Sequence, residues 1–254
     1  MQIAHGMGEH GGRYAQLAQA LNAGGHVVYA PDHRGHGRSM HAGKGRLGAD
    51  GWNLLVEDTA RLSRLLRDTH PGLPLALIGH SLGSFAVQQC VLENPWLVDA
   101  VALTGTTALD RLAAGLAHDA RTLMLSLNEP FQPARTIADW LSQDEDAVDA
   151  YLADPLCGFT LDTDGFRQLA QAGPRLAAPI GLPGSLPVYV CVGEDDPLNA
   201  GLTGSDLVVA RYREAGLTDI TYRTYSGARH EPLHETNRAE VVADLTTWLE
   251  DVTA

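Results

Sequence analysis

Positive charge is scarce in this sequence, and lysine is nearly absent: Lys44 is the only lysine in 254 residues. Lysine and arginine together number 18 against 31 acidic residues, which gives a formal net charge of −13 at pH 7. Most of such a surface would repel the phosphate backbone of a nucleic acid. We therefore do not expect nucleic acid as a partner.

Cysteine and long apolar stretches are also scarce. The three cysteines, Cys90, Cys157 and Cys191, are an odd number without metal-like spacing, so neither a disulfide framework nor a zinc cluster is expected. No stretch approaches the ~18 continuous apolar residues of a membrane span. Residues 1–12 do not have the basic start and apolar run of a signal peptide. These absences favour a cytoplasmic location.

Short apolar runs alternate with helical patterns along the chain. The runs span residues 27–30, 75–78, 98–103, 188–192 and 220–225, and most stop at glycine or proline, as buried parallel strands do. Apolar residues at helical spacing fill residues 14–21, 55–66 and 241–249. The alternation predicts an α/β fold with a mostly parallel central sheet flanked by helices.

The alternation is interrupted between residues 106 and 183, where the pattern is helical and contains no convincing strand. We therefore expect an α/β core of residues 1–105 and 184–254, with a helical insertion, residues 106–183, over the carboxyl edge of the sheet. The acidic run in residues 136–166 is either a solvated outer face or a field that disfavours anionic substrates. Apolar residues of the insertion fit internal packing as well as a tunnel lining: Leu112, Leu116, Leu123, Leu127, Trp140, Leu141, Tyr151, Leu152, Phe159 and Phe166.

A candidate nucleophile follows the second apolar run. Gly79-His80-Ser81-Leu82-Gly83 has the form G-x-S-x-G and precedes a helical stretch, residues 84–93. In this setting the glycines allow a tight, strained turn that presents the Ser81 hydroxyl at the end of its strand. A serine hydroxyl is a poor nucleophile at neutral pH, so it needs a base and the base needs an orienting acid.

The base and the acid are expected in loops at the same edge of the sheet. His230 follows the last run and precedes the last helix, whereas His234, its local competitor, lies closer to the acidic approach to that helix. The acid follows the run of residues 188–192, where the pattern alone does not separate Asp195 from Asp196. The order serine, aspartate, histidine is the one expected for a hydrolase of this architecture.

A serine that attacks a carbonyl also needs hydrogen-bond donors for the oxyanion that forms. The backbone N–H of Leu82, the residue after the nucleophile, is one candidate. The second is the N–H of Met7 in the early glycine-rich loop His5-Gly6-Met7-Gly8. A simple tight turn is the plainer interpretation of that loop.

Three motifs together carry a family resemblance. They are His5-Gly6-Met7-Gly8-Glu9-His10 followed by Arg13-Tyr14, then Asp32-His33-Arg34-Gly35-His36-Gly37-Arg38-Ser39, then the Ser81 pentapeptide. With them the chain resembles the monoacylglycerol lipase and lysophospholipase-like group of α/β-hydrolases, over nearly all of its length outside the insertion. The first motif is much more selective than G-x-S-x-G.

The resemblance implies several further assignments. It favours Asp196 over Asp195 as the acid, supports His230 as the base with Glu231 as a neighbour, and makes residues 151–159 part of a cap over an acyl-binding tunnel. A metal site at Asp32, His33 and His36 is the alternative interpretation of the second motif, but the family uses that loop structurally. His80 is expected to be a packing neighbour of the site. No metal or organic cofactor is implied.

The start of the chain departs from the family pattern. Family members carry a β-hairpin and a full strand before H-G-x-G, whereas only residues 1–4 precede it here. Either Met1 is not the native start, or the sheet lacks its first strands and Met7 depends on a very short strand. The second case predicts an exposed sheet edge and a possible homodimer.

These observations predict a serine hydrolase of carboxylic esters, with monoacylglycerols or similar short-to-medium-chain esters as substrates and possible transient contact between the cap and a lipid surface. A lysophospholipase, thioesterase or peptidase could use the same residues. A catalytically silent ligand-binding hydrolase fold is the alternative outside enzymes. Covalent labelling of Ser81 by a fluorophosphonate would separate the enzyme from the binder.

Overall fold

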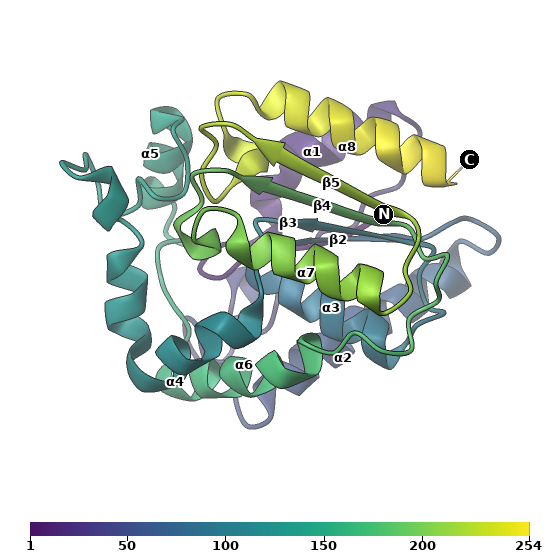
Figure 1. Cartoon of the computed structure of the whole chain (residues 1–254), viewed down its shortest axis with the longest axis horizontal. Coiled ribbons are helices and arrows are strands. Elements are labelled where there is room, and N and C mark those ends of the chain that lie inside the picture. The colour runs from purple at the N-terminus through teal and green to yellow at the C-terminus, as the bar shows by residue number, and fades with distance from the viewer. Residues whose placement is uncertain (254) are drawn as a thin grey trace.

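A five-stranded sheet forms the centre of the computed structural model, which describes residues 1–253 (Figure 1). Neighbouring strands are parallel throughout, and the order across the sheet follows the order along the chain. The strands are β1 (Gln2–Ala4), β2 (Ala76–His80), β3 (Ala100–Thr104), β4 (Val188–Gly193) and β5 (Ile220–Tyr225). Four of the five apolar runs are therefore confirmed as strands, to within two residues at each end.

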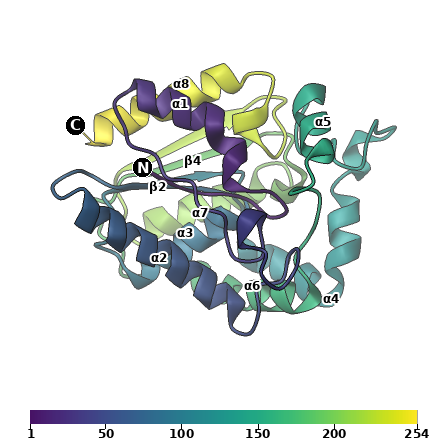
Figure 2. The same ribbon diagram turned by 180° about the vertical axis from the view of Figure 1, so that it is seen from behind.

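Helices cover both faces of this sheet, as the alternation predicts. Helices α1 (Ala15–Ala23) and α8 (Arg238–Thr253) lie on one face, and α2 (Gly51–Thr69), α3 (Leu82–Glu93) and α7 (Thr203–Glu214) lie on the other (Figures 1 and 2). Along β4, Val190 packs into the core below α2, α3 and α7, whereas its neighbours Tyr189 and Cys191 pack into the core below α1 and α8. This alternation is the two-residue period of a strand buried on both sides.

The segment of residues 106–183 is helical and lies toward the carboxyl ends of the strands (Figure 1). It holds α4 (Leu109–Ser126), α5 (Glu145–Ala153) and α6 (Thr163–Leu176), and α4 is kinked at Asp119. Helix α6 packs into the same apolar core as α2 and α3, so the insertion is continuous with the main core on that side. Short 3₁₀ turns complete the chain: η1 (Gly11–Tyr14), η2 (Gly37–Ser39), η3 (Glu129–Phe131), η4 (Pro197–Asn199) and η5 (Pro232–His234).

The predicted strand at residues 27–30 is wrong. Only Tyr29 forms a bridge, opposite Gln2 of β1, through hydrogen bonds from Ile3 N to Tyr29 O and from Tyr29 N to Met1 O. Strand β1 is three residues long, so it has little backbone with which to pair. Val27 is 47% exposed, so this apolar run does not form a buried strand.

The very short strand expected before Met7 is present as β1, but its outer edge is not left free. The bridge at Tyr29 covers it. Edge pairing through β1 is therefore less favourable than the sequence suggests, and the homodimer stays a prediction. Among residues 1–253, no helix combines the length and apolar character that crossing a bilayer requires.

Candidate active site

Ser81 lies in the sharp turn between β2 and α3. Its backbone angles are φ 50° and ψ −117°, which a non-glycine residue adopts only under strain. The backbone N–H of Ser81 is held by the Thr104 carbonyl at the end of β3 (3.0 Å). The Ser81 carbonyl accepts the N–H groups of Ser84 and Phe85 in the first turn of α3. The strained conformation is thus fixed from both sides of the turn.

The two glycines of the pentapeptide are required for a reason that differs from the expected one. Neither Gly79 nor Gly83 has a positive φ, so the strain of the turn is carried by Ser81 itself. A Cβ on Gly79 would lie 2.6 Å from the Gly83 carbonyl oxygen, and a Cβ on Gly83 would lie 2.1 Å from the Ala4 carbonyl oxygen. The glycines therefore allow close backbone approach, and Gly83 brings α3 against the end of β1.

His230 and Asp196 complete a hydrogen-bonded chain with Ser81. His230 Nε2 lies 2.9 Å from Ser81 Oγ, and His230 Nδ1 lies 2.9 Å from Asp196 Oδ2. Asp196 is buried and also accepts the N–H of Leu198 (2.9 Å), whereas Asp195 is exposed. The structure thus places Asp196, and not Asp195, beside His230.

The surroundings of His230 favour its protonated form despite burial. Burial alone would lower the pKa of His230, but the charge of Asp196 and its hydrogen bond outweigh burial and raise it above the ordinary value. His80 lies on one side of the ring, with centroids 5.1 Å apart, and donates to or accepts from Thr104 Oγ1 at 3.0 Å. Burial, together with the charge of His230, lowers the pKa of His80 to about 4, so this neighbour is neutral at pH 7.

The early glycine-rich loop lies directly against Ser81. A Cβ on Gly6 would lie 3.3 Å from the Ser81 Cβ, so the backbone of the loop packs against the candidate nucleophile. Met7, the next residue, lines the same cavity as Ser81 and Leu82. Leu82 is the first residue of α3, where a backbone N–H has no partner within the helix.

A buried ionic cluster joins this loop to the His230 loop. The Arg13 guanidinium binds both carboxylate oxygens of Glu231 (2.7 Å each) and one oxygen of Glu9 (2.5 Å). Glu9 also accepts the Tyr14 hydroxyl (2.7 Å) and the backbone N–H of Gly6. Burial would raise the pKa of Glu9, but the Arg13 charge, His80, His234 and the Tyr14 hydrogen bond together outweigh burial and hold that pKa at about 2. The early motif contains Glu9, Arg13 and Tyr14, and Glu231 is the expected neighbour of His230, but the sequence does not indicate that these side chains bind one another.

An apolar cavity of about 220 Å³ opens above Ser81. For the ten apolar residues of the insertion named above, the sequence did not separate internal packing from tunnel lining. All of them except Leu127 line this cavity. Leu125 and Ile137 stand at its rim and are 64% and 79% exposed. The cavity therefore has a polar floor at Ser81 and His230 and a long apolar wall built by the insertion.

His234 and Asp32, which the sequence offered as alternative site residues, make structural contacts. His234 Nε2 lies 3.2 Å from the Arg13 carbonyl oxygen, while His230 alone of the two reaches Ser81. The Asp32 carboxylate accepts the backbone N–H groups of Gly11 (2.9 Å) and Arg38 (2.7 Å). This carboxylate therefore holds two loops together.

One cluster outside these positions has metal-binding residue types. His10, Asp154 and Cys157 offer ligand atoms within 4.8 Å of one another. His10 Nδ1 accepts the Gly12 N–H, so the ring proton is on Nε2, which donates to Asp154 Oδ2 at 2.9 Å. A metal would need the lone pair of that Nε2. The hydrogen bonding therefore fits a contact between the two segments better than a metal site.

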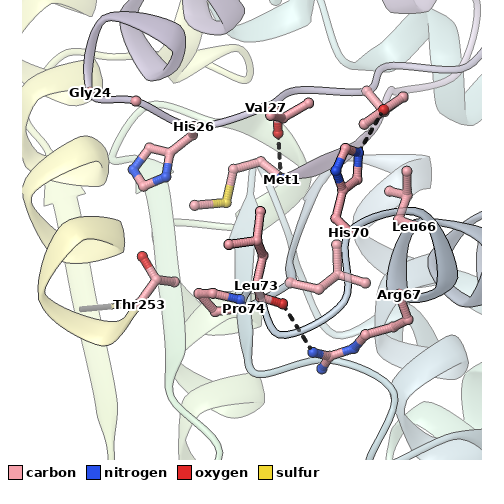
Figure 3. Close-up of a pocket in the computed structure, with 13 residues that line it drawn as sticks. Met1, Gly24, His26, Val27, Leu66, Arg67, His70, Leu73, Pro74 and Thr253 are labelled. Atoms are coloured by element: carbon pink, nitrogen blue, oxygen red, sulfur yellow. Dashed lines mark hydrogen bonds between the residues drawn. The ribbon is translucent and has the colours of Figure 1, made fainter.

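A second cavity, of about 280 Å³, lies beside the first residue of the chain and the start of β2 (Figure 3). Two pairs of its polar groups are bound to each other: the Met1 amino group donates to the Val27 carbonyl (2.7 Å), and the Tyr29 hydroxyl lies 2.9 Å from His70 Nε2. Among the described residues, the buried Nε2 of His26, which also lines this cavity, has no hydrogen-bond partner. Ser81, Asp196 and His230 do not line it. We assign it no part in the chemistry.

Comparison with known proteins agrees with this geometry. Residues 1–237 match the family described as serine aminopeptidase, S33. The monoacylglycerol lipase of Mycolicibacterium smegmatis is 34% identical over 97% of this chain and 86% of its own length. The human monoglyceride lipase is 29% identical over 99% of this chain and 82% of its own length. These relatives confirm the resemblance that the motifs predict.

Solved structures confirm the expected fold. A thermostable carboxyl esterase from Bacillus coagulans, solved in complex with glycerol, superposes with a TM-score of 0.90 at 25% identity and covers 100% of this chain and 89% of its own. A lipase in its open form superposes with a TM-score of 0.83 at 26% identity, with coverage of 99% and 89%. The α/β-hydrolase architecture is shared over the whole described chain.

Proposed function

The chain belongs to the family described as serine aminopeptidase, S33, and within that family we propose that it is a serine hydrolase that cleaves carboxylic esters, with monoacylglycerols as its substrate class. One observation carries this proposal: at the floor of an apolar cavity, His230 lies 2.9 Å from Ser81 Oγ through Nε2 and 2.9 Å from Asp196 Oδ2 through Nδ1. Relatives named as lipases and a carboxyl esterase support the reaction type.

The proposed reaction begins with proton transfer from Ser81 Oγ to His230 Nε2 as Oγ bonds to the ester carbonyl carbon. Asp196 keeps the His230 ring oriented and stabilises its positive charge. The N–H groups of Met7 and Leu82 hold the oxyanion. His230 then gives the proton to the leaving alcohol, and water releases the acyl group by the same route.

The cavity supports an acyl chain better than a charged peptide. Its wall is apolar, while its acidic residues, Glu9 and Glu231, are both bound by Arg13. An aminopeptidase needs a free carboxylate for the amino terminus of its substrate, and these two are already neutralised. A lysophospholipase or thioesterase fits the same site, and the choice among them depends on the alcohol or thiol that leaves.

We also propose that residues 106–183 form the cap of this enzyme and contact lipid surfaces through its rim. Leu125 and Ile137 are exposed beside the cavity mouth, where an acyl chain would enter. Acidic residues of the insertion, including Glu145 and Asp146, are exposed and favour neutral over anionic surfaces. The three cysteines are buried and free, which supports a cytoplasmic location.

A fluorophosphonate probe and a chain-length series test the proposal. We expect stoichiometric labelling of Ser81, loss of labelling in Ser81→Ala and His230→Ala, and turnover of monoacylglycerols by the wild type. Circular dichroism of both variants controls for folding. Unlabelled wild-type protein would refute the enzyme and favour a ligand-binding hydrolase fold. Labelling with p-nitrophenyl ester turnover but no turnover of monoacylglycerols would refute the substrate class alone.

A further inference from the structure

A tight turn of the insertion is bound to the loop that carries His230. The backbone N–H of His230 donates to the Trp140 carbonyl (3.4 Å), and that of Glu231 donates to the Leu141 carbonyl (2.8 Å). The Arg229 guanidinium donates to the carbonyls of Asp139 and Ser142. Successive residues of the loop thus hold the turn by its backbone. The backbone of Trp140 is thereby bound to the His230 loop.

The indole of Trp140 covers one face of the His230 ring. The two ring centroids are 4.9 Å apart and the ring planes are inclined by 33°. His80 lies 5.1 Å away at an inclination of 50°. Trp140 and His230 both line the cavity, so the indole lies beside the His230 ring at the edge of the proposed acyl-binding space.

We propose that Trp140 is a positioning residue whose indole face stabilises the protonated ring of His230 while the acyl-enzyme forms and breaks down. The inference rests on the proposed function, in which His230 takes a proton from Ser81. An aromatic face attracts a cation, most strongly when the pair is shielded from water, and indole is the strongest of the aromatic side chains in this respect. His230 is 2% exposed, so the pair is shielded.

The other charged groups around His230 leave this role open. Asp196 provides the direct counter-charge, and Glu231 and Glu9 also favour the protonated ring, although Arg13 neutralises much of their charge. His80 is neutral at pH 7 because its pKa is lowered to about 4. Trp140 contacts the ring from the insertion and can favour the imidazolium without competing with Ser81 or Asp196 for a hydrogen bond.

Replacing the indole by an apolar side chain without a π face separates this effect from burial. We expect Trp140→Leu to lower the pKa of His230, read from the acid limb of kcat/KM for a soluble ester, by about half a unit. We expect the plateau at high pH to fall about threefold, because the imidazolium of the transition state is less stable. Trp140→Phe, which keeps an aromatic face, should restore most of both values.

Controls distinguish the inference from a general loss of structure and from failure of the proposed function. Trp96→Leu makes the same chemical change at a residue that is 80% exposed and away from the cavity, and it should leave the profile unchanged. A lower plateau with an unmoved or raised pKa in Trp140→Leu would refute the inference. So would a Phe variant that behaves like the Leu variant. If wild-type activity survived in His230→Ala, the proposed function itself would fall instead.

Discussion

Two parts of the insertion meet the active site in different ways. The turn at residues 138–142 is joined to the His230 loop by backbone hydrogen bonds and contains the buried residues Leu141 and Ser142. Helix α4 contributes apolar side chains to the cavity, is kinked at Asp119 and exposes Leu125. Because one part binds the His230 loop and the other only lines the cavity, we propose that the first acts on rate and the second on substrate choice.

The largest effect is expected from the ionic cluster that holds the His230 loop from the opposite side. Arg13→Met leaves the buried carboxylates of Glu9 and Glu231 without a cation, which costs about 3–5 kcal/mol of unfolding free energy. Tm should fall by on the order of 10 °C in calorimetry. Arg34→Met removes an exposed ion pair with Asp58 and serves as the matched control. Equal losses in the two variants would contradict a role specific to the cluster.

The same cluster predicts that the stability of the wild type and that of Arg13→Met change with pH in opposite directions. In the wild type the pKa of Glu9 is lowered to about 2, so its stabilisation is present above about pH 4.5 and is lost as the pH falls from there toward 2. In Arg13→Met, burial without a cation raises the pKa of Glu9. The free energy of unfolding of that variant should therefore increase as the pH falls from 8 to 5. Urea unfolding at both pH values measures the difference. A variant that is less stable at pH 5 than at pH 8 would be inconsistent with buried, unpaired carboxylates.

Release of the turn should lower kcat with little effect on substrate binding. Arg229→Met removes the guanidinium that holds the Asp139 and Ser142 carbonyls. We expect kcat for a short p-nitrophenyl ester to fall about tenfold, because small displacements of a catalytic group are costly. KM should stay within about twofold. A change confined to KM would show that the turn acts on the cavity and not on His230.

A change in α4 should instead alter the preference for acyl-chain length and leave the reaction of short esters nearly unchanged. Met124 is half-buried and lines the cavity, so Met124→Trp shortens the apolar space while leaving the His230 loop untouched. We expect kcat/KM for long-chain esters to fall about tenfold and that for acetate esters to change less than about twofold. Met124→Leu, which keeps the volume, is the control. Equal losses at every chain length would place the effect on the chemistry.

The smallest effect is expected at the exposed rim. Leu125→Ser should reduce turnover of emulsified monoacylglycerols about threefold by weakening contact with the lipid surface, while rates on soluble esters stay the same. Ile180→Ser alters a residue that is 79% exposed but outside the cavity, and should change neither rate. Parallel losses on soluble and emulsified substrates would argue against surface contact.

The strands and the polar site were accessible from sequence because each depends on a local signal. Ser81, Asp196 and His230 each follow a strand whose apolar run is plain, although the choice of Asp196 over Asp195 needed the family resemblance. Residues 27–30 misled because an apolar run at a sheet edge need not be buried. Trp140 gave no such signal, since it lies in an irregular turn and contacts His230 across 90 residues of sequence. The glycines of the pentapeptide were found, but their role in backbone approach depends on the three-dimensional contact with Ala4.

The hydrogen bonds between the turn at 138–142 and residues 229–231 also determine what can be exchanged between relatives. A chimera that replaced all of residues 106–183 with the cap of another lipase would remove the support of its own His230 loop. A transplant that kept the native turn and the residues by which α4 packs into the core, and replaced only its cavity-lining side chains, would alter the proposed acyl-binding wall. We therefore expect the segment that can be exchanged between relatives to be smaller than residues 106–183, with its boundary inside the proposed cap.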